Sequence, residues 1–309
     1  MIHSVQYLIN SFLWQPCRLL KREMSDVEEV GEGGEGAEIY PYGEYEGGRD
    51  ENLDRHGWGS ALLPNGDIYE GNYRRGLRMG KGLYCFRNGA RYDGDWRKGK
   101  KHGIGTFVYP DGTTYTGQWR KDLKHGHGTY HYANGDTYEG NWFRNFRHGL
   151  GTYSYNDVNV TFYGTWKNGR MEGPGVLKYP GYRYHGKFEQ NLPKGPGCFT
   201  FENVWMQHGF YLNIRDPAFD YVGAEDLTLD DTEETTESEY RGNPRGIVPI
   251  WRARSVAAFK SELLPPSPVP LPYKDSEDSL ISIMEYLEQQ YTIATGENET
   301  DGYVDENDL

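Results

Sequence analysis

A short pattern of aromatic residues and glycine returns about every 23 residues through the middle of the 309-residue chain. The pattern is aromatic-x-Gly-x-aromatic, as in Tyr92-Asp-Gly-Asp-Trp96, and successive starts lie 22 to 24 residues apart. The starts are Tyr45, Tyr69, Tyr92, Tyr115, Tyr138, Phe162, Tyr184 and, in degenerate form, Gln207. So regular a period indicates repeated units that each pack mainly on their neighbours.

Within each unit the pattern has a period of two, which is typical of a β-strand. Tyr92, Gly94 and Trp96 then share one face, while Asp93 and Asp95 point to the other. We expect the aromatic face to form the core, with each glycine leaving room for a ring from the adjacent strand to lie flat. The residues assigned to this structural core are Tyr69, Gly71, Tyr73, Tyr92, Gly94, Trp96, Tyr115, Gly117, Trp119, Tyr138, Gly140, Trp142, Gly164, Trp166, Tyr184 and Gly186.

A second signature, Gly-x-Gly followed by alternating aromatics, completes each unit, as in residues 125–132. Asn-Gly or Asp-Gly pairs, which suit tight hairpin turns, separate the two signatures at 65–66, 88–89, 111–112 and 134–135. The predicted fold is therefore all-β. It is an elongated antiparallel β-hairpin array of about seven to eight repeats over residues 45–212.

Tyr138-Glu-Gly-Asn-Trp142 and Gly126-His-Gly-Thr-Tyr130, at this spacing, resemble the MORN repeat, and the resemblance covers residues 45–212. The match weakens toward the C-terminus. Asn156-Asp-Val-Asn159 replaces the Asn-Gly turn, Gly173-Pro-Gly175 replaces His-Gly-x-Gly, and Gln207 replaces the opening tyrosine. We expect the C-terminal repeats to be less regular.

The segments that flank the array are acidic. Residues 1–44 carry 3 basic and 8 acidic side chains, and residues 213–309 carry 7 and 22, whereas residues 45–212 carry 23 and 16. We expect both flanks to be largely disordered, because they are rich in charge and poor in apolar residues. The acidic flanks either contact the basic array or partners, or simply maintain solubility.

Segments 246–254 and 279–291 of the C-terminal flank are candidate docking elements. The first is extended and apolar-basic, which suits addition to a sheet edge, and the second has the spacing of a short amphipathic helix. Two alternatives stay open for each, packing on its own array or docking a partner. The residues in question are Ile250, Trp251, Leu280, Ile283, Met284 and Leu287. Between these segments, Pro265–Pro272 predicts a stiff extended spacer.

Residues 2–20 are apolar but lack a basic region before them and are interrupted by polar residues, so they do not read as a signal peptide. They are predicted to be an unstructured extension, with a start at Met24 or a membrane-surface helix as alternatives. The three cysteines form no CxxC pair, which favours a reducing compartment and a protein that is not secreted.

No phosphate-binding loop, nucleophile elbow, HExxH or kinase signature occurs, so no catalytic residue, cofactor or metal is predicted. MORN repeats accompany lipid kinase and methyltransferase domains in other proteins, but the acidic C-terminal flank is too short and polar for such a core. Most histidines, at 56, 102, 125, 127 and 148, precede a glycine at one repeat position. They predict a packed ladder in preference to zinc ligands.

Basic residues cluster after the first strand of each repeat and predict a positive ridge. They are Arg74, Arg75, Arg78, Lys81, Arg97, Lys98, Lys100, Lys101, Arg120, Lys121 and Lys124. Such a ridge suits anionic lipid through charge alone. A solvated loop rich in lysine is the simpler explanation, and no nucleic acid is expected.

Among MORN proteins, the acidic lead, the opening Glu44–Arg49 and the Pro249-Ile-Trp251 element look like the radial spoke head family of motile cilia and sperm flagella. The resemblance implies a non-enzymatic scaffold in the cytoplasm and axonemal cytoskeleton. Its partners would be other radial spoke head and stalk proteins, with self-association through the array ends. The alternatives are a membrane-apposition module that binds anionic phospholipid, or a regulator of an enzyme.

Overall fold

The computed structural model describes residues 43–219 and 245–271. The chain divides into two compact units, residues 1–269 and 270–309, and every strand described here belongs to the first. No helix in the described ranges is both long and apolar enough to cross a membrane. Of the predicted flanks 1–44 and 213–309, residues 1–42, 220–244 and 272–309 lie outside the described residues, and so does the predicted helix 279–291.

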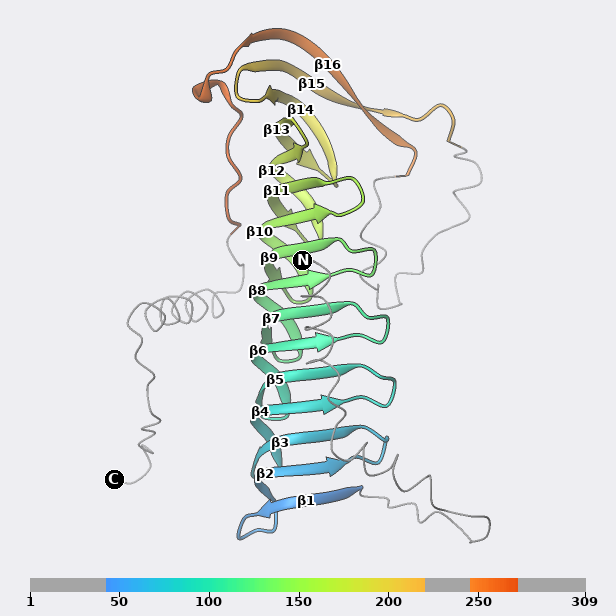
Figure 1. The fold of residues 1–309 in the computed structure, drawn as a ribbon, viewed down its shortest axis with the longest axis vertical. Coiled ribbons are helices and arrows are strands. Elements are labelled where there is room, and N and C mark those ends of the chain that lie inside the picture. The colour runs from blue at the N-terminus through green and yellow to red at the C-terminus, as the bar shows by residue number, and fades with distance from the viewer. Residues whose placement is uncertain (1–42, 220–244, 272–309) are drawn as a thin grey trace, which may run out of the picture. The chain divides into compact units, whose positions relative to one another are not determined.

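Sixteen antiparallel strands form one sheet in which each strand pairs with the next along the chain (Figure 1). The prediction of an all-β antiparallel hairpin array is confirmed. The strands are β1 (Glu44–Arg49), β2 (Arg55–Leu62), β3 (Ile68–Arg74), β4 (Leu77–Cys85), β5 (Arg91–Arg97), β6 (Lys100–Val108), β7 (Thr114–Arg120), β8 (Leu123–His131), β9 (Thr137–Phe143), β10 (Phe146–Tyr155), β11 (Val160–Lys167), β12 (Arg170–Tyr179), β13 (Tyr182–Glu189), β14 (Leu192–Phe201), β15 (Trp205–Arg215) and β16 (Ile247–Ala258).

An unbroken row of glycines crosses the sheet from β1 to β15. Gly71 pairs with Gly82, Gly82 with Gly94, and Gly94 with Gly105, and the same register continues to Gly209. The row keeps all repeats in register because each glycine meets the glycine of both neighbouring strands. A side chain anywhere in this row would strike the next strand or the ring above it.

Tyrosine rings cover the glycine row. Tyr92 lies in the same strand as Gly94, folds back over it, and donates a hydrogen bond from its hydroxyl to the Asp95 carbonyl at 3.0 Å. The same ring covers Gly105 on β6. The expectation that a ring from the adjacent strand covers each glycine is therefore right for Gly105 but wrong for Gly94, because the tyrosine two residues earlier in the same strand reaches both.

Tryptophans tie each repeat to the previous one. Trp119 on β7 donates its indole N–H to the Gly105 carbonyl on β6 at 3.0 Å, and Trp142 on β9 donates to Gly128 on β8 at 3.0 Å. The Trp119 ring meets Tyr115 and Tyr92 edge to face, with centroids 5.1 and 5.4 Å apart. Each ring thus contacts its own repeat and the one before it, an arrangement in which aromatic pairs add to simple burial.

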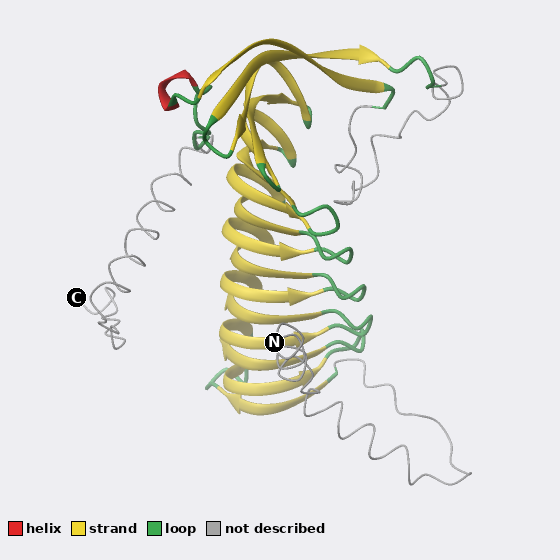
Figure 2. Ribbon diagram, turned by 45° about the horizontal axis from the view of Figure 1, so that its top comes forward, coloured by secondary structure: helices red, strands yellow, loops and turns green. Residues whose placement is uncertain are grey.

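Every even-numbered strand of the central repeats bulges near its middle. Between Gly94 and Trp96 on β5 lies one residue, whereas three separate their partners Gly105 and Lys101 on β6. Gly103, inside this bulge, has φ +57°, a conformation that favours glycine. Such bulges bend and twist strands, and Figure 2 shows strands that curve strongly along the whole stack.

The structure extends the sheet past the predicted boundary at residue 212. β15 continues to Arg215, and β16 pairs with its whole length. The pairing begins with Trp205 opposite Ala258 and ends with Arg215 opposite Ile247. The C-terminal repeats are indeed less regular. At the glycine row, β16 carries Ala253 opposite Gly209, and the bulge of β14 leaves two residues unpaired, between Lys194 and Gly197, where β6 leaves three.

Candidate protein-interaction surfaces

A ladder of cations lies inside the aromatic layer, four residues before the glycine row on the even-numbered strands. Arg78 lies 4.5 Å from the Trp96 ring centroid, Lys101 4.5 Å from Trp119, Lys124 4.8 Å from Trp142, and Arg147 4.4 Å from Trp166. Lys124 is only 4% exposed and Arg147 only 8%. Stacking on ring faces compensates for part of the cost of removing these charges from water.

This ladder corrects the predicted ridge. Arg78, Lys101 and Lys124 were assigned to it, but the structure turns all three toward the rings. Lys81 is also elsewhere, on the opposite face, where it pairs with Asp95 at 2.8 Å. The signal that sequence reasoning missed was the constant spacing to the glycine row, which places these cations on the core side of the strand.

Burial lowers the pKa of Lys101 to about 8, from 10.5, and the nearby Asp122 only partly opposes this shift. Below about pH 8 the amine is charged in both states and its burial costs stability. Between about pH 8 and 10.5 only the unfolded chain keeps the proton, so stability rises with pH in that window. We expect the unfolding free energy of the wild type, relative to Lys101→Met, to rise between about pH 7 and 9.5.

Urea unfolding at the two pH values tests this. The control is Lys100→Met at an exposed neighbouring position, and the difference in unfolding free energy between wild type and this control should be the same at both pH values. A difference between wild type and Lys101→Met that is independent of pH would contradict the desolvated amine.

Except for Arg120, which is half-buried, the remaining basic residues form an exposed row, which we call the basic edge. Its members lie at or beside the tight turns that join each odd-numbered strand to the next strand, and they are Arg74, Arg75, Arg97, Lys98, Lys100 and Lys121. Lys98 and Gly99, with φ +51° and +79°, form one such two-residue turn. These turns lie two strands apart, so their charges recur roughly every 10 Å along the sheet.

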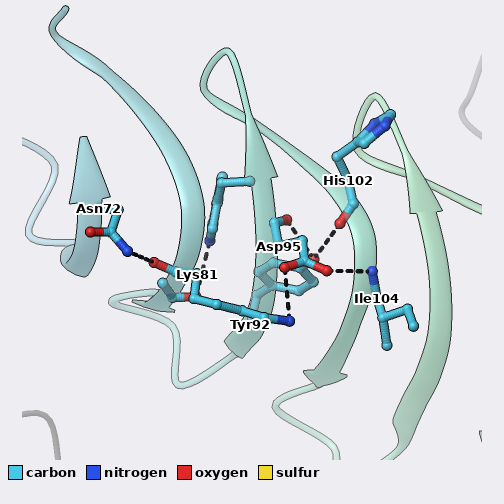
Figure 3. A network of polar contacts seen from close by, with 8 residues as sticks. Asn72, Lys81, Tyr92, Asp95, His102 and Ile104 are labelled. Carbon is cyan, nitrogen blue, oxygen red and sulfur yellow. Dashed lines mark hydrogen bonds and ion pairs between the residues drawn. The ribbon is translucent and has the colours of Figure 1, made fainter. Parts of the chain in front are cut away.

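On the face opposite the aromatic layer, polar side chains bind the backbone of the bulges, as Figure 3 shows for Asp95 and Ile104. Asp95 accepts a hydrogen bond from the Ile104 backbone N–H at 2.9 Å and pairs with Lys81 at 2.8 Å. In the next repeat, Gln118 Oε1 accepts the equivalent hydrogen bond from the His127 backbone N–H at 2.8 Å. These side chains satisfy the backbone of the bulges, so their polarity has a structural cause.

Only some of the five histidines pack within the array: His125 is buried and His102 and His148 are half-buried, whereas His56 and His127 are exposed. Phe143 lies between His125 and His148, with ring centroids 5.6 Å from each. Burial lowers the pKa of His148. Within the described ranges no group of three His, Cys, Asp or Glu side chains is placed to hold a metal ion.

Residues 246–254, one of the candidate docking segments, belong to the sheet. Trp251 lies over Gly209, donates its indole N–H to Gln207 Oε1 at 3.1 Å, and meets the Phe199 ring edge to face at 4.9 Å. Ile250 pairs with Leu212. The two alternatives were packing on its own array and docking a partner, and in the structure this segment packs on its own array. Leu280, Ile283, Met284 and Leu287 lie outside the described residues.

The sixteen residues assigned to the structural core all lie on the strands of the aromatic layer. Tyr69, Tyr92, Tyr115 and Tyr138 are fully buried. The glycines of that set belong to the row that crosses the sheet. These residues therefore build the scaffold, and the surfaces left for partners are the basic edge, the polar face and the two end strands.

Comparison with known proteins agrees with this architecture. The MORN repeat family model matches residues 69–91, 92–114, 115–137, 138–157, 162–182 and 184–203. The chain is 46% identical over 95 residues to the radial spoke head 1 homolog of Mus musculus and 47% identical over 54 residues to that of Cyprinus carpio. These alignments cover 31% and 18% of this chain, and 26% and 25% of the relatives, so the chain spans about a quarter of their length.

Among solved structures, the TCP domain of SAS-4 from Drosophila melanogaster aligns with 58% of this chain and 97% of that chain, at 11% identity and a TM-score of 0.36. A TM-score this low carries no argument about the fold. The register of the sheet and the family match agree on the repeat unit. Residues 69–203 are an array of MORN repeats, in a chain that is similar over part of its length to radial spoke head 1 homologs.

Proposed function

We propose that the protein is a non-enzymatic structural subunit of the radial spoke head in the axoneme of motile cilia and sperm flagella. The identity of 46% over 95 residues with the mouse radial spoke head 1 homolog carries this proposal. The array supports it physically, because a single sheet stabilised repeat by repeat holds long surfaces at fixed spacing. The array bridges other spoke head and stalk proteins and stiffens the head.

The polar groups of the repeats fit a scaffold. Asp67 and Asp136 are buried and accept hydrogen bonds from the hydroxyls of Tyr84 and Tyr153, at 2.6 and 2.8 Å. Each carboxylate also accepts a backbone N–H, from Arg87 or Asn156. Carboxylates engaged in this way fix the turns between repeats.

Deletion of the protein from ciliated cells tests the proposal. We expect a tagged copy to co-sediment with demembranated axonemes, and we expect its loss to remove spoke head density in tomograms and to alter the waveform. Re-expression of the wild type should restore both. Intact spoke heads and a normal beat in its absence would refute the proposal.

Binding of anionic phospholipid is the second candidate, and the exposed basic edge favours it. A vesicle containing phosphatidylserine would attract these charges, with an affinity that falls as salt rises. Co-pelleting with such vesicles over a salt series distinguishes the candidates. Salt-sensitive binding that is lost in Arg97→Glu/Lys98→Glu, and kept in the matched variant Arg252→Glu/Arg254→Glu on β16, would support the lipid function.

A further inference from the structure

The chain turns back after β16 and runs across the sheet as a strap, defined here as residues 259–269 (Figure 1, orange to red). At its start, the Phe259 N–H donates to the Val204 carbonyl at 2.9 Å and the Lys260 N–H approaches Met206 Sδ at 3.4 Å. At its end, Thr165 Oγ1 on β11 donates to the Val269 carbonyl at 3.2 Å. The strap therefore spans from β15 to β11.

The strap lies on the face opposite the aromatic layer. Met206 and Cys198 on that face are 0% exposed, and Thr200 and Thr165 are 2% exposed. In the central repeats the corresponding face is open, since Asp93, Thr116 and Glu139, which share the cross-strand row of Cys198, are exposed. Deep burial on this face thus coincides with the path of the strap.

The length of the strap fits this path. Ser261–Leu263 form a short 3-10 helix that rises about 2 Å per residue, whereas the extended residues around it rise about 3.1 Å each, so residues 260 to 269 span about 24 Å. Four strand spacings from β15 to β11 amount to about 19 Å. The surplus matches a diagonal course, because Met206, Cys198 and Thr165 occupy three successive cross-strand rows of the face.

The sequence of the C-terminal repeats prepares this face for the strap. In the central repeats Asp95 and Gln118 accept the N–H groups of the bulges. Pro174 and Pro196 occupy the corresponding bulge positions and have no N–H to offer. Thr165, in the position of Asp95, is consequently available to donate to the strap.

The strap presents its own apolar side to the protein. Leu264, Pro265 and Pro268 are half-buried, whereas Pro266 and Ser267 are exposed. Leu264 has φ −69° and ψ 145°, the conformation of a polyproline II helix. A chain already restricted to this conformation loses little entropy when it docks.

We propose that the face of β11 to β15 is a docking site for an extended proline-rich segment of a partner protein, which the strap occupies in cis. The strap identifies the ligand chemistry, namely a polyproline II segment with an apolar residue ahead of two prolines and a backbone carbonyl placed for Thr165. Hydrogen bonds between described residues hold it mainly at its two ends, so a segment in trans can compete along its length. This inference does not depend on the proposed role in the spoke head.

A release variant of the full chain tests the site. Leu264→Ser/Pro265→Ser/Pro268→Ser removes the half-buried contacts of the strap, and Pro266→Ser/Ser267→Ala alters its exposed residues as the matched control. The probe is a labelled peptide of residues 259–269. We expect it to bind the release variant at least about tenfold tighter than the wild type or the control, because the strap no longer competes.

The Cys198 thiol reports on the strap independently. In a background with Cys17→Ser and Cys85→Ser, maleimide should modify Cys198 at least about tenfold faster in the release variant, and added peptide should restore protection. Thr165→Val should weaken peptide binding to the release variant, whereas Thr116→Val, on the open part of the face, should leave it unchanged.

Equal peptide affinity and equal Cys198 reactivity in all variants, with circular dichroism unchanged, would overturn the proposal. So would a strap exchanged between two copies, seen as a concentration-dependent dimer of the release variant that excludes the peptide, because the occupant would then be a second copy of this chain.

Discussion

Replacing Trp142 with alanine is expected to lower the unfolding free energy by about 4 kcal/mol, within the range for large buried aromatic residues. The ring is 1% exposed and meets Tyr115 and Tyr138 edge to face, with centroids 5.3 and 5.2 Å away. Its loss also removes the 3.0 Å donor of the Gly128 carbonyl and one of the rings on which Lys124 stacks. The lost hydrogen bond to a buried carbonyl adds to the cost of the cavity.

Urea unfolding followed by tryptophan fluorescence measures this effect. Trp58→Ala is the matched control, because that ring is 63% exposed and its loss should cost less than about 0.5 kcal/mol. Similar losses in the two variants would show that the aromatic layer does not carry the stability of the array.

Gly94→Val is expected to cost about 3 kcal/mol, at the upper end of the usual range for overpacking. A Cβ at this position would lie 2.5 Å from the Gly105 Cα and 2.6 Å from the Tyr92 hydroxyl. The backbone of β6 cannot move aside without breaking the glycine row, and displacing Tyr92 exposes the core of two repeats.

Thermal melting tests the Gly94 variant against Asp93→Val, the neighbouring exposed residue on the opposite face, where valine suits a strand and the change should stay within about 0.5 kcal/mol. Because neighbouring repeats share rings, hydrogen exchange should show the loss of protection centred on β5 and β6. Unchanged melting of Gly94→Val would contradict the packing of rings over glycines.

The candidate surfaces were only partly predictable from the sequence. The run of Lys and Arg after each first strand correctly indicated a basic edge at Arg97 and Lys98, but Lys101 and Lys124 point into the core. Lys101 and Lys124 lie four residues before Gly105 and Gly128, and an even spacing puts them on the face of the rings, a signal that the clustering of charge does not carry. The strap was expected only as a spacer, because its partner Thr165 is 104 positions away in sequence.

The sequence by itself determined the repeat, the strands, the turns and the face on which the rings lie, because the period of two and the Asn-Gly turns act between residues close in the chain. Only the tertiary structure decided what depends on distant residues. It placed β16 on β15, stacked Trp251 on Gly209, and laid residues 259–269 across β11 to β15. Those contacts join residues far apart in the chain, such as Thr165 and Val269 or Gln207 and Trp251, and no single repeat contains both partners.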